Sequence, residues 1–155
     1  MPTSLMDEIK QTKPFARPAD EALVSIMRTA VVLEHAQNEA LRPHGLTLTQ
    51  YNVLRILRGA GRRGLCGREI AERMVSNVPD VSRLLDRMEE MGTIRRARDA
   101  DDRRHVTARI APKGRRVLSQ ASPALEQVAR SRFGRLAPSA VPALIRALAA
   151  IREPV

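Results

Sequence analysis

The sequence predicts a mainly α fold with one small β-hairpin. Two observations support this prediction: apolar residues recur at helical spacing in six segments, and one short segment alternates apolar and polar residues around a turn. The chain has 155 residues, enough for one domain or two small subdomains with a shared core. Aromatic residues make up 2% of the chain, so we expect an aliphatic core. Few aromatics also argue against a platform that stacks the bases of single-stranded nucleic acids.

The charge balance indicates a polyanionic partner. Lys and Arg number 27 against 17 Asp and Glu, which gives a formal net charge of +10. A basic domain of this size favours nucleic acid first and an anionic membrane surface second. No run of 18 apolar residues is present, and the only cysteine is Cys66, so we expect a cytoplasmic chain without membrane contact.

The sequence contains no pattern typical of an enzyme or a metalloprotein. His35, His44 and His105 stand on separate predicted elements, at spacings that do not suit a metal ion. Glycine-rich phosphate loops and nucleophile–base motifs are absent from the sequence as well. We therefore expect no metal, no cofactor and no enzymatic activity.

The first half of the chain predicts an arm followed by two helices. Residues 1–18 show no sustained pattern and form the arm. A helix is predicted over 20–41 with Asp20 as its N-cap, and Pro43 and Gly45 end it. A second helix is predicted over 47–57, where Thr47 and Gln50 form a capping-box pattern.

A helix-turn-helix pattern follows. A third helix is predicted over 67–75, with Ile70, Ala71 and Met74 facing inward. A turn follows, in which Asn77 is expected to cap the next helix and Pro79 to lie in its first turn. This fourth helix is predicted to run to Met91 and to stop at Gly92. Its buried stripe is predicted to consist of Val81, Leu84, Leu85 and Met88. Its outward face is predicted to carry Asp80, Ser82, Arg83, Asp86, Arg87 and Glu90.

The fourth helix is suited to a major groove because its outward side chains are polar and long enough to reach base edges. Arg83 and Arg87 stand one turn apart and project together. Strands predicted over 93–98 and 104–110 form an arginine-rich hairpin, with a turn at 99–103. A helix-turn-helix followed at once by such a hairpin indicates a winged helix, whose hairpin tip can place a guanidinium in the minor groove.

The remaining residues predict two more helices. One covers roughly 115–135, where Pro123 should bend or break it, and the last covers 141–151. With the helix over 20–41, these helices carry apolar stripes that find no partner inside the lobe, so we expect them to pair with those of a second copy. The predicted organisation is an arm and dimerisation helix (1–46), a winged helix-turn-helix lobe (47–114) and C-terminal dimerisation helices (115–155).

Several segments together resemble the MarR-type (multiple antibiotic resistance regulator) family of winged-helix regulators. They are LTLTQYNVL at 46–54, REIAERM at 68–74, VSRLLDRMEEMGTIRR at 81–96, DRR at 102–104 with Val106, and IAPKG at 110–114. The resemblance covers about residues 20–152. The chain departs from the family pattern at Ala111-Pro112, where Thr is common, and at Cys66, where Ser or Thr usually begins the third helix.

The resemblance implies a homodimeric, DNA-binding regulator. Ser82 and Arg83 match the pair that contacts bases, Arg103 and Arg104 match the hairpin arginines, and Asp102 matches the acid that holds the hairpin. Many members of the family lose DNA affinity when a small aromatic acid or phenol binds between the dimer base and the lobe. The complete set of candidate DNA-contacting residues is Asn77, Asp80, Ser82, Arg83, Arg87, Arg103 and Arg104.

Other candidate residues have competing interpretations. Asp102 and Arg104 can form a turn-stabilising ion pair, Arg104 can enter the groove, and the two roles are compatible. Arg28, His35 and Tyr51 are candidate ligand residues, with core or interface filling as the alternative for each. Cys66 is the sole redox candidate, although a small residue in a cap position is the simpler interpretation.

The sequence as a whole predicts a sequence-specific regulator of transcription, a repressor that binds a palindromic double-stranded operator as a homodimer. A non-specific architectural DNA binder is the first alternative, and it would show little sequence preference and a steep salt dependence. A winged-helix adaptor for proteins is the second, although Arg83, Arg87 and Arg104 speak against it.

Overall fold

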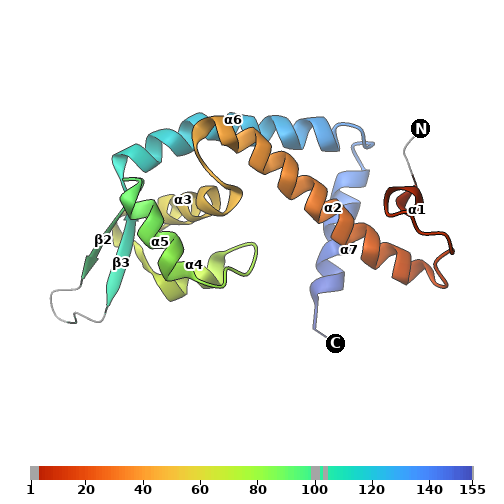
Figure 1. Ribbon diagram of the computed structural model, residues 1–155, viewed down its shortest axis with the longest axis horizontal. Coiled ribbons are helices and arrows are strands. Elements are labelled where there is room, and N and C mark those ends of the chain that lie inside the picture. Colours follow the sequence, from red (N-terminus) through yellow and green to blue (C-terminus); the bar gives the residue numbers. More distant parts are fainter. Residues whose placement is uncertain (1–3, 99–101, 103–104, 155) are drawn as a thin grey trace. The chain divides into compact units, whose positions relative to one another are not determined.

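The computed structural model describes residues 4–98, 102 and 105–154, and it is mainly helical with a small antiparallel sheet (Figure 1). Contacts between Cα atoms divide the chain into an N-terminal unit, residues 1–37, and a C-terminal unit, residues 38–155. The mainly α fold with a β-hairpin is therefore confirmed.

The N-terminal unit holds a short helix and most of a long one. Helix α1 spans Leu5–Glu8, and the hydroxyl of Ser4 caps it by accepting from the Asp7 N–H. Helix α2 spans Pro18–Leu41, so the predicted N-cap at Asp20 is wrong. Proline suits the first turn because the N–H it lacks has no intrahelical partner there. Asp20 lies inside the first turn and pairs with Arg17 at 2.9 Å.

The C-terminal unit contains the remaining helices and all three strands. Helix α3 begins after Thr47, where Thr47 and Gln50 form the predicted capping box. In chain order the elements are η1 (Arg42–His44), α3 (Leu48–Ala60), η2 (Gly61–Arg63), β1 (Leu65–Cys66), α4 (Gly67–Arg73), α5 (Val81–Glu90), β2 (Ile94–Arg98), β3 (Val106–Ile110), α6 (Pro112–Phe133) and α7 (Ala140–Arg152).

Three predictions about these helices are wrong. Helix α4 ends at Arg73, two residues early, and Ala71 is exposed rather than inward-facing. Helix α6 begins at Pro112, three residues before the predicted start, with Ala111 as its N-cap. Of the two effects predicted for Pro123, a bend or a break, the break is absent, because α6 continues through it. Proline breaks a helix where the freed carbonyl four residues earlier cannot find another partner. Ser119 occupies that position on an exposed stretch of α6, so water can reach its carbonyl.

The sheet has three strands in the order β1-β3-β2, all antiparallel. The predicted hairpin is β2 and β3, in which Ile94 lies opposite Ile110 and Arg98 opposite Val106. Strand β1 was not predicted, because two residues are too few to show an alternating pattern. It adds to the free edge of β3, with Leu65 opposite Ala108.

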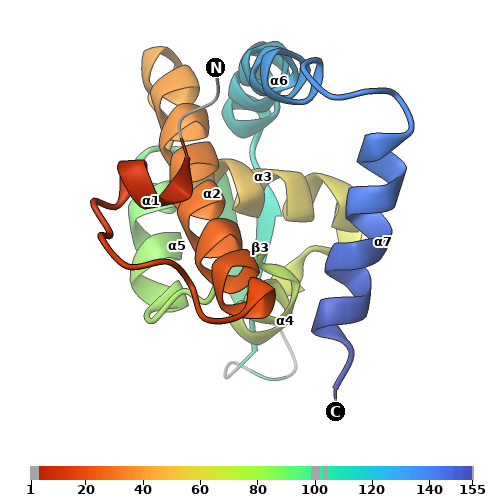
Figure 2. The same ribbon diagram turned by 90° about the vertical axis from the view of Figure 1, so that its right-hand side faces the viewer.

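The core is aliphatic, as the composition predicts. Fully buried side chains come from every layer of the lobe: Leu54 and Leu57 on α3, Ile70 on α4, Met88 on α5, and Leu118 on α6. Helix α3 is central, because it contacts α4, α6 and β3 (Figure 2). The buried face of α5 packs against this core, and its opposite face lies in solvent.

Candidate nucleic-acid interface

Helices α4 and α5 form the predicted helix-turn-helix. The chain leaves α4 at Met74, whose backbone is extended, and α5 begins at Val81. Asn77 is not the cap of α5, contrary to the prediction. The carboxylate of Asp80 caps it by accepting from the Arg83 N–H at 2.9 Å, which uses Asp80 locally and leaves Asn77 exposed in the turn.

Helix α5 has a buried face and a polar face, as its periodicity predicts. Leu85 and Met88 are buried, while Val81 and Leu84 are half-buried. Ser82, Arg83, Asp86, Arg87 and Glu90 are exposed. The hydrophobic contacts therefore set the rotation of α5 about its own axis, and that rotation places the two arginines in solvent.

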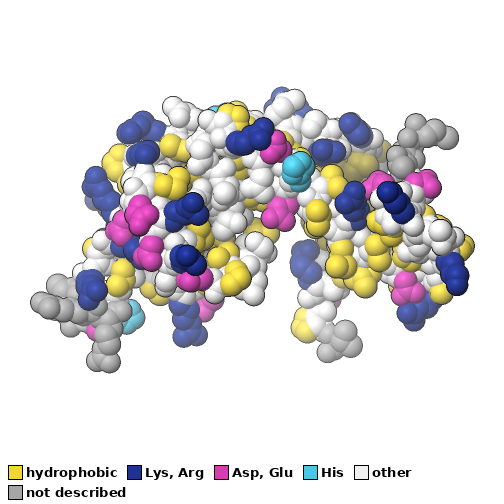
Figure 3. Space-filling model, viewed as in Figure 1, with side chains coloured by type: hydrophobic (Ala, Val, Ile, Leu, Met, Phe, Trp, Pro, Cys, Tyr) yellow, Lys and Arg dark blue, Asp and Glu magenta, His cyan; other side chains and the backbone are white. Residues whose placement is uncertain are grey.

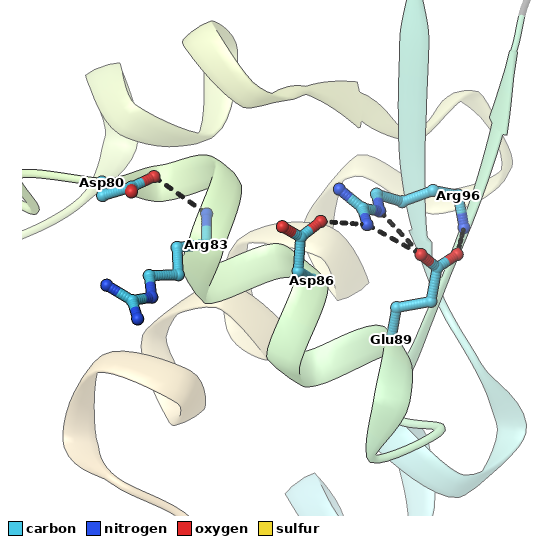
Figure 4. A network of polar contacts seen from close by, with 5 residues as sticks. All are labelled: Asp80, Arg83, Asp86, Glu89 and Arg96. Atoms are coloured by element: carbon cyan, nitrogen blue, oxygen red, sulfur yellow. Dashed lines mark hydrogen bonds and ion pairs between the residues drawn. The ribbon is translucent and has the colours of Figure 1, made fainter.

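The outward face of α5 borders an open groove with a volume of about 780 Å³. Arg83 and Arg87 both line it, so the structure brings these two predicted residues to one surface. The Arg83 guanidinium points away from the helix and from the polar network beside it (Figure 4). The other lining residues are Thr47, Thr49, Gln50, Asp80, Leu84, Asp86 and Glu90.

Arg96 joins the hairpin to α5. Its backbone N–H donates to Glu89 Oε1 at 3.1 Å, and its Nε and Nη2 donate to Glu89 Oε2 at 2.9 and 2.8 Å (Figure 4). Nη2 also donates to Asp86 Oδ1. Arg96 lies on the face of β2 turned toward α5, with Ile94 two residues before it. The clamp, as we call Arg96, Asp86 and Glu89, fixes the angle between the hairpin and the helix.

The electrostatics of the clamp follow from these bonds. The side-chain and backbone hydrogen bonds from Arg96 lower the pKa of Glu89 below its ordinary value of 4.5. Burial lowers the pKa of Arg96, but the hydrogen bonds to Asp86 and Glu89 outweigh burial and raise it overall. Both effects favour the charged forms, so the clamp is an ion network at neutral pH.

The tip of the hairpin is only partly described. Arg103 and Arg104, the predicted DNA-contacting arginines of the hairpin, lie outside the described residues. Asp102 is exposed, and its backbone carbonyl accepts from the His105 N–H at 2.9 Å. Arg98, the last residue of β2, is exposed on the way to the tip.

The three candidate ligand residues are distributed over both units. Arg28 and His35 belong to the N-terminal unit, where Arg28 pairs with Glu8 at 3.3 Å and His35 is exposed. Tyr51 belongs to the C-terminal unit and is buried, with its hydroxyl 3.0 Å from Ser122 Oγ. The Ser122 hydroxyl donates to the Leu118 carbonyl at 2.7 Å, so the Tyr51 hydroxyl is the donor in the first bond.

Cys66 is the N-cap of α4, as predicted, and its thiol is half-buried. Its backbone N–H donates to Glu69 Oε2 at 3.0 Å, which is the main reason that the pKa of Glu69 is lowered. Across the parts of the chain that the structure describes, no group of three His, Cys, Asp or Glu side chains could hold a metal ion. Within the same ranges, no helix combines the length and the apolar character needed to cross a bilayer.

The clamp is the feature that the sequence analysis missed. Asp86 and Glu89 stand three residues apart on α5, and strand alternation places Arg96 on the same side of β2 as the buried Ile94. Those two patterns together would have indicated an ion network between helix and strand. The hairpin arginines are thus not equivalent: Arg96 is occupied inside the lobe, while Arg95 and Arg98 are exposed.

Three comparisons with known proteins agree with this geometry. The model of the MarR family matches residues 46–106, which run from just before α3 to the first residue of β3. The chain is 35% identical over 91 residues to the HTH-type transcriptional regulator TtmR of Methylorubrum extorquens. That match covers 59% of this chain and 46% of TtmR, so the chain spans about half the length of this curated relative.

Solved structures match over most of the chain. Sco3205, a MarR family transcriptional regulator from Streptomyces coelicolor solved in complex with DNA, is 26% identical, with a TM-score of 0.74 over 93% of this chain and 94% of that one. CouR from Rhodococcus jostii RHA1, solved with p-coumaroyl-CoA, is 26% identical, with a TM-score of 0.71 over 91% of this chain and 98% of that one. The winged helix, the matched segment and these likenesses together identify residues 46–106 as a MarR family domain.

Proposed function

We propose that this protein is a sequence-specific transcriptional regulator, a repressor that binds a palindromic DNA operator as a homodimer. The observation that supports the proposal best is the outward face of α5, where Arg83 and Arg87 line one groove and neither guanidinium forms an ion pair with a described residue. Sco3205, similar over most of the chain, was solved in complex with DNA.

In this proposal α5 enters the major groove. Arg83 and Ser82 lie in its first turn, where side chains reach base edges, and Arg87 follows one turn later. The clamp holds the hairpin beside α5, so that Arg104 can meet the adjacent minor groove and Arg103 a phosphate. Asn77 and Asp80 lie in the turn and cap before α5, close to the phosphate backbone.

The homodimer is supported by apolar side chains in solvent. On α2, Leu23, Met27 and Val31 are spaced four residues apart and are each about 60% exposed. On α7, Ile145 and Ile151 are exposed to a similar degree. Hydrophobic side chains gather visibly over the N-terminal unit (Figure 3). Contiguous apolar surface of this kind marks an interface, and a second copy carries the matching stripes.

Twofold symmetry then predicts the form of the operator. Two α5 helices related by the dimer axis would contact half-sites one helical turn apart, about 34 Å. We expect light scattering to give the mass of two subunits. A monomeric mass at micromolar concentration would contradict the dimer, and with it the palindrome.

The test of sequence-specific binding begins with selection of a duplex from a random library, followed by titration of wild type, Arg83→Ala and Arg130→Ala. Arg83→Ala should lose about 1–3 kcal/mol of specific binding, because it removes base contacts. Arg130 is an exposed arginine on α6 and serves as the matched loss of one charge. If selection returns no consensus while mixed-sequence DNA binds strongly, the protein is a non-specific architectural binder instead.

A small aromatic acid or phenol is the effector we propose. CouR, of similar fold and 26% identity, was solved with p-coumaroyl-CoA. Tyr51 would have to exchange its bond to Ser122 for one to the ligand. Calorimetry with salicylate should show binding that weakens in Tyr51→Phe, and salicylate should release the selected duplex. Absence of heat and of release with several such acids would remove the effector from the proposal.

A further inference from the structure

The sheet has a second face that the interface above does not use. Strand alternation turns Ile94, Arg96 and Ile110 toward the core and α5, and it turns Arg95 and Arg109 the other way. Arg95 and Arg109 are directly opposite each other in the β2–β3 register, and both are exposed. Two like charges therefore stand side by side on the face of the sheet that points away from α5.

A third arginine joins them through a close approach of the backbone. Arg109 Nε donates to the carbonyl of Arg62 in η2 at 2.7 Å, which holds the Arg109 guanidinium beside η2. Gly64 makes this approach possible: its φ is +69°, and a Cβ there would lie 2.5 Å from the Ala108 carbonyl oxygen and 2.7 Å from Arg109 Cγ. The outer sheet patch, as we call Arg62, Arg95 and Arg109, is thus assembled from two segments far apart in sequence.

Among the described parts of the chain, no acidic side chain pairs with the patch. Arg63 and Arg68, which lie close to it in the chain, are each paired with a glutamate of α4, and Arg96 is held in the clamp. None of the three patch arginines forms an ion pair with any residue that the structure describes. Like charges directly opposite each other on neighbouring strands are destabilising. An external anion with several spaced charges would relieve this repulsion.

We propose that the outer sheet patch binds phosphate groups of duplex DNA that continues past the segment contacted by α5. The inference rests on the proposed function, since it assigns a second DNA surface to the same protein. Duplex DNA fits because its charges are regularly spaced and each guanidinium can bind one phosphate through two N–H donors. The patch and α5 lie on opposite faces of the sheet, so the duplex must extend beyond the hairpin to reach both.

The experiment compares two duplexes that share the selected sequence. The short one is limited to the two half-sites, about 20 base pairs, and the long one carries flanks of about 10 base pairs on each side. Wild type is compared with Arg62→Gln/Arg95→Gln/Arg109→Gln, and with Arg115→Gln/Arg116→Gln/Arg130→Gln, which removes three exposed charges from α6. Because α6 belongs to the segment expected to dimerise, light scattering checks that this second variant keeps the mass of wild type. Each affinity is measured at several salt concentrations.

We expect wild type to bind the long duplex at least tenfold more tightly than the short one at low salt. The patch variant should lose this advantage, keep its affinity for the short duplex, and show a salt slope reduced by about 0.9 for each phosphate that it no longer binds. The α6 variant should behave as wild type. The melting temperature of the patch variant should stay close to that of wild type, because removal of the repulsion between Arg95 and Arg109 offsets the loss of the Arg109 bond to the Arg62 carbonyl.

Other results overturn the inference. If the patch variant keeps wild-type affinity and salt slope on the long duplex, the patch does not bind DNA, whether or not it binds an acidic protein. If the α6 variant loses as much as the patch variant, the effect is one of net charge alone. If wild type binds no duplex at all, the proposed function fails first, which is a distinct outcome.

Discussion

Arg96 on β2 donates three hydrogen bonds to Glu89 on α5, with donor–acceptor distances of 3.1, 2.9 and 2.8 Å. One bond comes from the backbone and two from the guanidinium, so both the position of the strand and the orientation of the side chain depend on one carboxylate. The two elements proposed to enter adjacent grooves are thereby joined at a single ion network.

A double-mutant cycle measures this network. Arg96→Ala and Glu89→Ala should each destabilise the lobe, and their effects should be non-additive by about 1 kcal/mol in urea unfolding, because both remove the two hydrogen bonds from the Arg96 guanidinium to Glu89. Arg98→Ala, on the same strand but exposed and without an ion pair to a described residue, should change the stability by less than about 0.5 kcal/mol. Strictly additive effects of the first two changes would show that the side-chain bonds between Arg96 and Glu89 contribute nothing.

The lowered pKa of Glu89 predicts an acid sensitivity. A carboxyl whose pKa is lower in the folded than in the unfolded state stabilises the fold fully above its unfolded pKa, and this contribution is lost as the pH falls through its folded pKa. Stability should therefore fall as the pH drops below about 4.5. Glu89→Gln should make that fall shallower. Unfolding free energies measured from about pH 3 to pH 6 test this. An identical pH profile for the two proteins would contradict this prediction. Glu69, whose pKa is also lowered, is present in both proteins, so its contribution to the fall is the same in each.

Substitution of alanine for glycine should have opposite effects on stability at two positions. Gly64→Ala should destabilise by about 1–3 kcal/mol, because the new Cβ meets the Ala108 carbonyl and the backbone has a positive φ. Gly59 lies in α3 with open space around it, so Gly59→Ala should stabilise by up to about 1 kcal/mol. Thermal unfolding of the two variants checks both signs, and destabilisation by both would show that α3 tolerates no added methyl group at this end.

Removing the hydroxyl of Tyr51 and removing that of Ser122 should lower the free energy of unfolding by different amounts, although the two hydroxyls share one hydrogen bond. Tyr51→Phe removes the donor and leaves Ser122 bonded to the Leu118 carbonyl, so the cost should be about 1 kcal/mol. Ser122→Ala leaves the buried Tyr51 hydroxyl without its acceptor and should cost more, about 1–3 kcal/mol. Denaturant titrations of both variants give the comparison, and the reverse order would mean that the tyrosine hydroxyl finds another acceptor.

The local periodicities of the sequence determined most of the fold. The capping box at Thr47, the stripe from Val81 to Met88, the stop at Gly92 and the alternation of Ile94, Val106 and Ile110 are all properties of residues close together in the chain, and all are present in the structure. Short-range patterns are read reliably because helices and hairpins form from neighbouring residues.

Tertiary structure decided what each charged side chain does. No local pattern distinguishes Arg95, Arg96 and Arg98, yet one is part of a like-charged pair, one is bound by two carboxylates of α5, and one is exposed near the hairpin tip. The same holds for β1, whose two residues become a strand only because β3 offers them a free edge. Ion pairs and edge strands depend on partners distant in sequence, so only packing of the lobe establishes which arginines remain available to bind an anion.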